Sequence, residues 1–323
     1  MRRSPRRLMI ACAGVLAAGG LAAGCSAKPG AAYVAGPARP AMPKVSAAAA
    51  PRPARPAGPV IEVTGAPAKV KAKAAVLADA ATGQVLWARN PGVQRPMASL
   101  TKVMTAYMII QAGDLGRTVT VPKGVIAYAS KYGGESGGTR AGEKLTVRDL
   151  LYDLLLQSGA DAAYTFGNVY GPGMGSFIAR MNATAKQLGM DHTHFTSPDG
   201  LPYPTETSTY STPSDLLLLA EAAMKSPDFR SIVDTVQFHV TKGQGHSEHW
   251  WYNDDSLLRT YRGAVGIKTG FTNQAGHCLL FEAIRGDRPL VGVILGSPAT
   301  GFNAGEDDAT KILNWGFSLR QKP

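Results

Sequence analysis

The pattern of hydrophobic positions predicts strands toward both ends of the chain and helices between them. Apolar runs from Ala74 to Asp79 and from Val85 to Ala88, joined by the turn Ala81-Thr82-Gly83, predict a hairpin. Three apolar runs between Val265 and Leu295, separated by short polar turns, predict three more strands. Helical periodicity marks the remaining elements, at Ala98–Gln111, Thr146–Gln157, Asp161–Val169, Gly175–Leu188, Pro213–Met224 and Ala304–Ser318.

This order of elements predicts an α/β (α+β) fold. Strands from both ends that enclose a run of helices favour an antiparallel sheet flanked by helices, with an all-helical subdomain inserted between its strands. Residues 70–323 are enough for one large domain or two interleaved lobes around one core. Thr146 and Asp149 have the spacing of a capping box, which places a helix start at that point.

The N-terminus has the pattern of a signal peptide. Four arginines precede an apolar run from Leu8 to Gly24. Residues 21–25, Leu-Ala-Ala-Gly-Cys, resemble a lipobox, which predicts that residues 1–25 are a leader and that Cys25 is lipidated. We therefore expect an extracytoplasmic protein held on the outer face of the cytoplasmic membrane. The alternative is ordinary cleavage near Ala27 and a secreted product.

Residues 26–69 are rich in alanine and contain nine prolines, which is typical of an extended, disordered tether. The leader and tether also account for the basic composition. Residues 1–59 hold nine of the 34 lysines and arginines and none of the 23 acidic residues. The rest of the chain, with 25 basic and 23 acidic residues, is near neutral. The high net charge is therefore no argument for binding nucleic acid, and we expect none.

Ser99 and Lys102 form the first motif that carries chemistry. Ser99 lies in the opening turn of the predicted helix that runs to Gly113, and the three-residue spacing puts Lys102 on the same helical face. A serine hydroxyl needs a neighbouring base to become a nucleophile. A lysine with a pKa of about 10.4 cannot serve at neutral pH, but burial and a nearby cation lower that pKa. An isolated Ser-x-x-Lys is more often an ordinary helix with a solvated lysine.

The second informative motif is Lys268-Thr269-Gly270. It lies on the first of the three C-terminal strands, with glycines where another backbone would approach closely. A strand edge beside a nucleophile can pair with an extended peptide, while Lys268 and Thr269 face a carboxylate. The alternative is a surface turn with a solvated lysine.

Three segments together resemble the motifs of serine D-alanyl-D-alanine carboxypeptidases, the low-molecular-weight penicillin-binding proteins. They are residues 95–102 around Ser99, the Gln157–Ala162 segment around Ser158, and residues 266–270 around Lys268. The resemblance covers roughly residues 70–317. It implies the β-lactamase/transpeptidase-like fold and a serine D-Ala-D-Ala carboxypeptidase or transpeptidase that acts on peptidoglycan stem peptides and is inhibited by β-lactams such as penicillin.

The resemblance also assigns roles to individual residues. Ser99 would be the acylated nucleophile, Lys102 its general base, and Ser158 a relay of the proton to the leaving group. Lys268 and Thr269 would hold the terminal carboxylate of the substrate. The backbone N–H groups of Ser99 and Phe271, the latter following Gly270, would form the oxyanion hole. The family pattern includes no cofactor and no metal, so none is expected.

One position departs from the family pattern. The middle motif is usually Ser-x-Asn, and Ala160 stands at the asparagine position. Alanine cannot donate a hydrogen bond to the amide carbonyl of a substrate, so substrate positioning should suffer. We therefore expect altered activity rather than lost activity.

Two other functions are compatible with parts of this pattern. A class A β-lactamase needs a glutamate that activates water against the acyl-enzyme, and Glu206, Glu221 and Glu248 lack the sequence context for that role. A catalytically weakened penicillin-binding lipoprotein would explain Ala160. The complete set of Ser99, Lys102, Ser158 and Lys268 argues against it.

Three other features of the sequence give only weak support for additional functional sites. Residues 134–138, Gly-Glu-Ser-Gly-Gly, fit a serine-hydrolase motif but lie in a glycine-rich connection with no strand before it. The histidines lack the helical spacing of a zinc site. Cys278, inside an apolar strand, is expected to be a small core residue without a disulfide.

Overall fold

The computed structural model describes residues 63–301 and 303–320. The predicted leader, Cys25 and most of the predicted tether lie outside these residues. The strands, in chain order, are β1 Ala74–Asp79, β2 Val85–Arg89, β3 Arg95–Pro96, β4 Thr118–Thr120, β5 Lys144–Thr146, β6 Tyr210–Ser211, β7 Gln237–Val240, β8 His249–Tyr252, β9 Ala264–Thr272, β10 Gly276–Arg285 and β11 Arg288–Ser297. The helices are the 3₁₀ turn η1 Ala98–Leu100, α1 Thr101–Ala112, α2 Val125–Tyr132, α3 Val147–Leu156, α4 Ala160–Val169, α5 Met174–Gln187, α6 Pro213–Ala223, α7 Pro227–Val233, α8 Leu257–Thr260 and α9 Ala304–Ser318.

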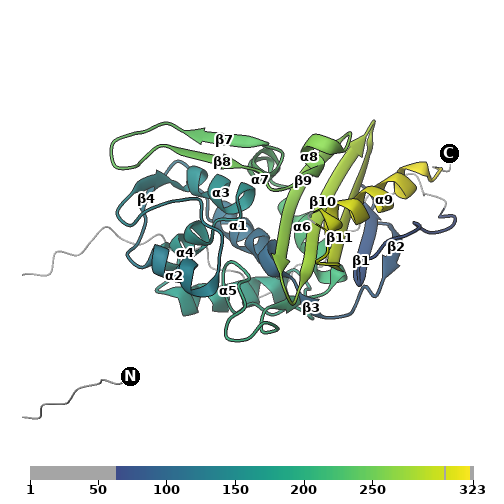
Figure 1. The fold of residues 1–323 in the computed structure, drawn as a ribbon, viewed down its shortest axis with the longest axis horizontal. Helices are drawn as coiled ribbons and strands as arrows, with labels where there is room; N and C mark the ends of the chain where they lie inside the picture. Colours follow the sequence, from purple (N-terminus) through teal and green to yellow (C-terminus); the bar gives the residue numbers. More distant parts are fainter. Residues whose placement is uncertain (1–62, 302, 321–323) are drawn as a thin grey trace, which may run out of the picture. The chain divides into compact units, whose positions relative to one another are not determined.

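The central sheet combines strands from the two ends of the described chain, as the sequence predicts. Its order is β2-β1-β11-β10-β9 and every neighbouring pair is antiparallel (Figure 1). Gly286, at φ +64°, makes the tight turn between β10 and β11. Because β9 is the last strand in this order, one of its edges is left unpaired within the sheet, beside the helices.

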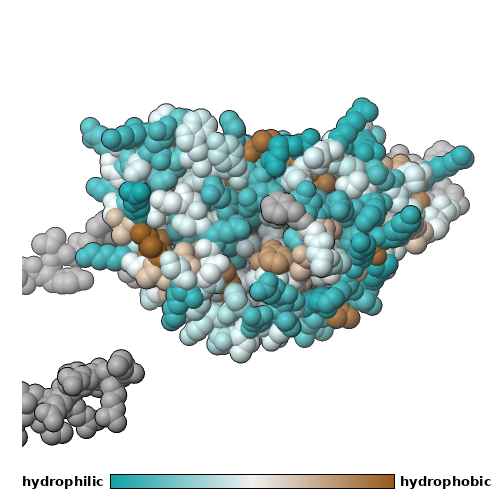
Figure 2. All heavy atoms as spheres, in the orientation of Figure 1, coloured by the Kyte–Doolittle hydropathy of each residue, from teal (hydrophilic) through white to brown (hydrophobic). Residues whose placement is uncertain are grey.

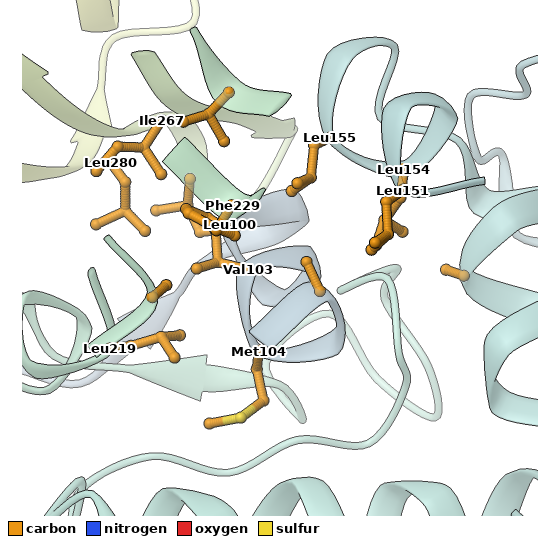
Figure 3. Packing of buried hydrophobic residues seen from close by; sticks show 14 of the residues in the cluster. Leu100, Val103, Met104, Leu151, Leu154, Leu155, Leu219, Phe229, Ile267 and Leu280 are labelled. Carbon is orange, nitrogen blue, oxygen red and sulfur yellow. The ribbon is translucent and has the colours of Figure 1, made fainter. Parts of the chain in front are cut away.

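Side chains alternate between the two faces of the sheet, and each face has its own hydrophobic core. On one face Leu77, Leu279 and Ile294 pack with Ile312 and Leu313 of α9. On the other face the sheet packs against α1, α6 and α7. Figure 3 shows how η1 and α1 join the two lobes: Leu100 and Val103 lie between Ile267 and Leu280 of the sheet and leucines of α3. α1 is therefore buried around most of its surface.

The helical lobe contains α1 to α5, with α4 contacting α2, α3 and α5. The predicted capping box is present, because the Thr146 side chain accepts a bond from Asp149 N and the Asp149 carboxylate accepts one from Thr146 N. The leucines expected to face the core, Leu150, Leu151, Leu154 and Leu155, are all buried. No helix within the described residues is long and apolar enough to cross a membrane.

Two corrections to the predicted elements matter for the site. The helix expected from Ala98 begins as an α-helix only at Thr101, after the η1 turn. The reason is that Ala98 has φ +49°, a left-handed conformation that no α-helix accommodates. Second, α2, α7 and the β7–β8 hairpin were not predicted, and the hairpin contributes Gln237 and Tyr252 to the wall around the site.

Candidate active site

Ser99 lies at the junction between β3 and α1, in the middle of the η1 turn. Pro96 is fixed by the pairing of β3 with β6, and the left-handed Ala98 then turns the chain into η1. A non-glycine residue with positive φ is uncommon and costs energy, and such residues gather at functional sites. The left-handed conformation of Ala98 places Ser99 just before the N-terminus of α1, where the residue is only partly buried.

Lys102 is the partner of Ser99. Its Nζ lies 3.0 Å from Ser99 Oγ, and it donates a second bond of 3.0 Å to the main-chain carbonyl of Asp199. The lysine is only 1% exposed. Gly200 makes this approach possible: it has φ +83°, and a Cβ there would lie 1.9 Å from the carbonyl oxygen of Ala98. The loop at Asp199 therefore fixes the direction in which the amine points.

The surroundings make Lys102 a usable base. Burial, helped by the nearby charge of Lys268, lowers its pKa to about 8, although Asp199 opposes the shift. At pH 7 this pKa leaves about a tenth of the lysine neutral, against less than about a thousandth at the reference value. The expectation that burial and a second cation would lower this pKa is confirmed.

The edge strand β9 runs directly beside Ser99. A Cβ on Gly270 would lie 3.0 Å from the backbone N of Ser99 and 3.3 Å from that of Leu100, so the glycine allows this close contact without displacing its neighbours. Lys268 is 1% exposed and its Nζ lies 3.4 Å from Thr269 Oγ1. Burial lowers the pKa of Lys268, while Asp254 is the largest opposing influence. The third motif thus places a buried cation and a hydroxyl next to the nucleophile.

Ser158 links α3 to α4 and faces the same space. It has φ +61° and is 5% exposed, so a strained backbone holds a nearly buried hydroxyl in place. Gly159 follows because no side chain fits: a Cβ there would lie 2.0 Å from Asp153 Oδ1 and 2.8 Å from Asp161 Oδ1. Ala160 is fully buried against Leu201, in a small apolar cluster.

Asp161 fixes the glycine-rich loop in front of α4. Its carboxylate accepts hydrogen bonds from Ser136 Oγ, Gly137 N and both the N–H and hydroxyl of Thr139. Ser136, the serine of the competing Gly-Glu-Ser-Gly-Gly pattern, is therefore bonded to Asp161 as part of a structural loop. The same loop bonds to the second motif, because Ala160 N donates to the carbonyl of Glu135.

Asp153 is a buried acid under the second motif. It is 0% exposed, and among the described residues neither of its oxygens has a hydrogen-bond donor. Burial and the adjacent Asp161 carboxylate raise the pKa of Asp153 well above its usual range. In the protonated form Asp153 can donate a hydrogen bond to Asp161. That bond would connect α3, which carries Asp153, to the glycine-rich loop that Asp161 holds.

We expect Asp153→Asn to change the pH dependence of stability. The unfolded carboxyl ionises near pH 3.9, whereas the folded one holds its proton to higher pH, so the folded state loses stability between these values as pH rises. Asparagine carries no such cost. The melting temperature of the variant relative to wild type should therefore rise as the pH increases above about 4. Asp287→Asn, in the exposed β10–β11 turn, is the control, and a pH-independent difference for Asp153→Asn would contradict a protonated Asp153.

These residues surround a cavity of about 970 Å³. Ser99, Lys102, Ser158, Thr269, Gly270 and Phe271 all line it. Two of the residues singled out from the sequence do not line the cavity. Lys268 is buried next to Thr269, and Ala160 is buried against Leu201. Cys278 is a free, buried thiol at the cavity wall. Within the described part of the chain, no group of three or more His, Cys, Asp or Glu side chains could hold a metal ion.

The arrangement can support acyl transfer. A part-exposed hydroxyl has a base of lowered pKa 3.0 Å away, backbone N–H groups near the start of a helix, and a second hydroxyl at Ser158 in the same cavity. Sequence reasoning missed the role of the Asp199 carbonyl and the cavity walls from Glu135 and the β7–β8 hairpin. A main-chain carbonyl leaves no signature in residue types. β7 could have been found from the alternation of polar and apolar residues in Gln-Phe-His-Val, and β8 from its run of aromatic residues.

Comparison with known proteins agrees with this geometry. The sequence pattern of the D-alanyl-D-alanine carboxypeptidase family matches residues 61–299. A D-alanyl-D-alanine carboxypeptidase of Streptomyces sp. (strain K15) is 39% identical over 250 residues, which cover 74% of this chain and 84% of the relative. One from Mycobacterium tuberculosis is 37% identical, with 77% and 83% of the two chains covered. A D-alanyl-D-alanine carboxypeptidase of Bacillus subtilis is 30% identical. The match covers 77% of this chain but only 62% of that relative.

Solved structures give the same result. The crystal structure of the Streptomyces DD-transpeptidase matches with a TM-score of 0.73 and 37% identity, covering 79% of this chain and all of that one. A penicillin-binding protein homolog from Mycobacterium tuberculosis matches with a TM-score of 0.71 and 35% identity, covering 83% of this chain and 98% of that one. The expected fold, an antiparallel sheet flanked by helices with an all-helical subdomain, is confirmed.

Proposed function

The chain belongs to the D-alanyl-D-alanine carboxypeptidase family, peptidase family S11, and from this premise we propose that Ser99 is its acylated nucleophile and Lys102 the general base. The observation that carries the proposal is the contact of 3.0 Å between Lys102 Nζ and Ser99 Oγ, made by a lysine whose pKa is lowered to about 8. A base near the working pH, held on the nucleophile, is the arrangement that general base catalysis requires.

The reaction follows from these positions. Neutral Lys102 takes the proton of Ser99 as Oγ attacks the carbonyl carbon between two D-alanines of a peptidoglycan stem peptide. The N–H groups of Ser99 and Phe271 hold the oxyanion. Ser158 then relays the proton from Lys102 to the leaving nitrogen, the C–N bond breaks, and D-alanine departs. Water hydrolyses the ester on Ser99 in a carboxypeptidase, and the amine of another stem peptide takes the acyl group in a transpeptidase.

Lys268 and Thr269 bind the terminal carboxylate in this proposal. The cation of Lys268 is buried, with its Nζ 3.4 Å from Thr269 Oγ1, so its attraction for a carboxylate in the cavity is weakly screened. Thr269 lines the cavity and can donate its hydroxyl proton directly. The free carboxylate of the last D-alanine is therefore the feature that the site selects.

Release of free D-alanine tests the proposed function. A diacetylated Lys-D-Ala-D-Ala peptide should release D-alanine, and the same peptide with an amidated C-terminus should react much more slowly because the carboxylate is gone. Preincubation with benzylpenicillin should block the release. Folded protein that releases no D-alanine and takes up no penicillin would contradict the proposal.

The three glutamates that the sequence offers for a β-lactamase reaction do not support that function, although Glu135 and Glu306 line the cavity. Among the described residues, the cavity is lined by neither Glu206, Glu221 nor Glu248. Glu248 is bonded to His239. The penicillin adduct should therefore be long-lived. A weakened binding protein is also unsupported, because the base and nucleophile keep their contact.

We expect Ala160→Asn to change the rate of acylation and to lower stability. Ala160 is fully buried beside Leu201, and it lies so close to Gly134 that a Cβ added to that glycine would come within 2.7 Å of the Ala160 Cβ. A larger side chain at position 160 must therefore displace Leu201 or the Gly134 backbone. Overpacking of this kind typically costs about 1–3 kcal/mol. Ala160→Val is the control for volume without an amide. Acylation by benzylpenicillin at the wild-type rate in both variants would show that position 160 is silent.

We also propose that residues 1–25 are a signal peptide with a lipobox, that Cys25 carries the lipid anchor, and that residues 26–69 tether the enzyme outside the cytoplasmic membrane. The support is the sequence pattern alone, because these residues up to 62 lie outside those described. Cys25→Ala should move the protein from the membrane fraction to the soluble fraction and abolish labelling by a radioactive fatty acid. A variant that stays membrane-bound would contradict the anchor.

A further inference from the structure

The β7–β8 hairpin has one buried face and one exposed face. Phe238 pairs with Trp251 on the buried face, where Phe238 stacks on Tyr152 of α3 with ring centroids 3.6 Å apart. Trp251 is 0% exposed, and its Nε1 donates to the carbonyl of Gly137 in the glycine-rich loop. The hairpin is therefore fixed to the helical lobe, which Figure 1 shows beneath it. The other face of the hairpin is therefore held in a fixed position and can bind a ligand without movement of the hairpin.

We call the exposed side, formed by Gln237, His239, Trp250 and Tyr252, the outer face. The register pairs Gln237 with Tyr252 and His239 with Trp250, so all four side chains lie on the same side. Trp250 is 45% and Tyr252 55% exposed. Two large aromatic side chains on one narrow exposed face are unusual for a surface that contacts only water.

The polar groups of the outer face are held in place. The imidazole of His239 stacks on the indole of Trp250, with centroids 3.7 Å apart and planes 10° from parallel. His239 Nε2 is also bonded to Glu248 Oε1, at 2.7 Å. This arrangement fixes the indole of Trp250, with the imidazole stacked on one of its faces and the Glu248 carboxylate bonded to that imidazole. Flat rings bordered by hydrogen-bonding groups suit ligands that have both apolar and polar sides.

The outer face is continuous with the catalytic cavity. Gln237 and Tyr252 line the cavity that also contains Ser99. A strand advances about 3.3 Å per residue, so Trp250 lies roughly 7 Å farther out than Tyr252. A ligand that leaves the cavity past Tyr252 therefore reaches Trp250 next.

We propose that the outer face binds the sugar that carries the stem peptide, an N-acetylated hexosamine unit of the glycan strand. This inference rests on the proposed function, which places the peptide terminus at Ser99. Three extended residues span about 10 Å, so the sugar at the far end of a stem peptide arrives near Trp250 rather than inside the cavity. Its C–H face can pack on the indole, and its hydroxyl and N-acetyl groups can bond to Glu248 and Gln237.

The chemistry of the hairpin favours a sugar over a membrane surface. Where Figure 1 labels β7 and β8, Figure 2 shows the same side of the molecule with hydrophilic and intermediate residues and little strongly hydrophobic surface. Glu248 adds a carboxylate that anionic lipid would repel. A sugar instead provides partners for both the rings and the polar groups.

Two substrates with the same peptide test the proposal. One is a free pentapeptide ending in D-Ala-D-Ala, and the other carries the N-acetylated disaccharide. In wild type the disaccharide substrate should have the higher kcat/KM. Trp250→Ala should lower the ratio of the two kcat/KM values about tenfold, through KM. Trp250→Phe should restore most of it, and Val85→Ala, an exposed residue on the far edge strand β2, should leave the ratio unchanged.

A binding measurement separates this proposal from the proposed function. Calorimetry with the peptide-free disaccharide should show saturable binding to wild type and weaker binding to Trp250→Ala, whether or not the enzyme turns over any peptide. Equal binding to both proteins, or an unchanged ratio of kcat/KM, would overturn the sugar site. So would loss of sedimentation with anionic vesicles in Trp250→Ala together with unchanged sugar binding, since that result assigns the face to the membrane.

Discussion

Ser99→Ala should abolish D-alanine release while leaving the fold intact. The substitution removes the only atom that forms the acyl bond, so turnover should fall by roughly 10⁴-fold or more. Ser99 is only partly buried, and Lys102 keeps its bond to the Asp199 carbonyl, so the variant should melt close to wild type. Steady-state D-alanine release and a thermal melt measure the two effects.

Ser136→Ala is the matched control. Ser136 belongs to the competing Gly-Glu-Ser-Gly-Gly pattern, but its hydroxyl donates to Asp161 within a structural loop. Its loss removes one of several bonds to that carboxylate, and most of the activity should remain. If Ser136→Ala is inactive and Ser99→Ala retains turnover, the nucleophile has been assigned wrongly.

Lys102→Met should slow acylation by about 10²- to 10⁴-fold, the usual contribution of a general base. Methionine approximates the length of the lysine stem in a site that is 1% exposed, so the chief loss is the amine that takes the proton of Ser99. Stopped-flow acylation by a chromogenic β-lactam measures the rate. Lys131→Met, at an exposed position on α2 directly after another serine, should acylate at the wild-type rate.

The pH profile identifies Lys102 as the base. Only the neutral amine accepts the proton, so the wild-type rate should rise about tenfold per pH unit below the pKa of about 8 and level off above it. The rise of the acylation rate with pH should be absent in Lys102→Met. A wild-type rate independent of pH between about 6 and 9 would contradict the role of Lys102.

The sequence pattern was sufficient to predict the position of helices that have strong local signals. α9 was predicted with its observed bounds, and α3 with its capping box, because apolar spacing and end signals agree there. The missed α2 buries only Val125 and Ala129, which is too weak a stripe to recognise. α7 is short, although Ser226 followed by Pro227 is a clear start signal.

The candidate site was predictable in its residue types but not in its supporting contacts. The spacing of Ser99 and Lys102 and the apolar helix around them predicted both the pairing and the direction of the pKa shift. The positive φ of Ala98 and the carbonyl of Asp199 could not be predicted, because the first depends on tertiary packing and the second is a main-chain atom 97 residues away. The burial of Lys268 likewise follows from how β9 packs against η1 and α7.

The most direct test of the account is the intact mass of the protein after incubation with benzylpenicillin, followed over time and mapped by peptide sequencing. The account predicts one persistent adduct of the mass of the antibiotic, located on Ser99. An adduct on another residue, or rapid loss of the adduct with release of hydrolysed antibiotic, would contradict it.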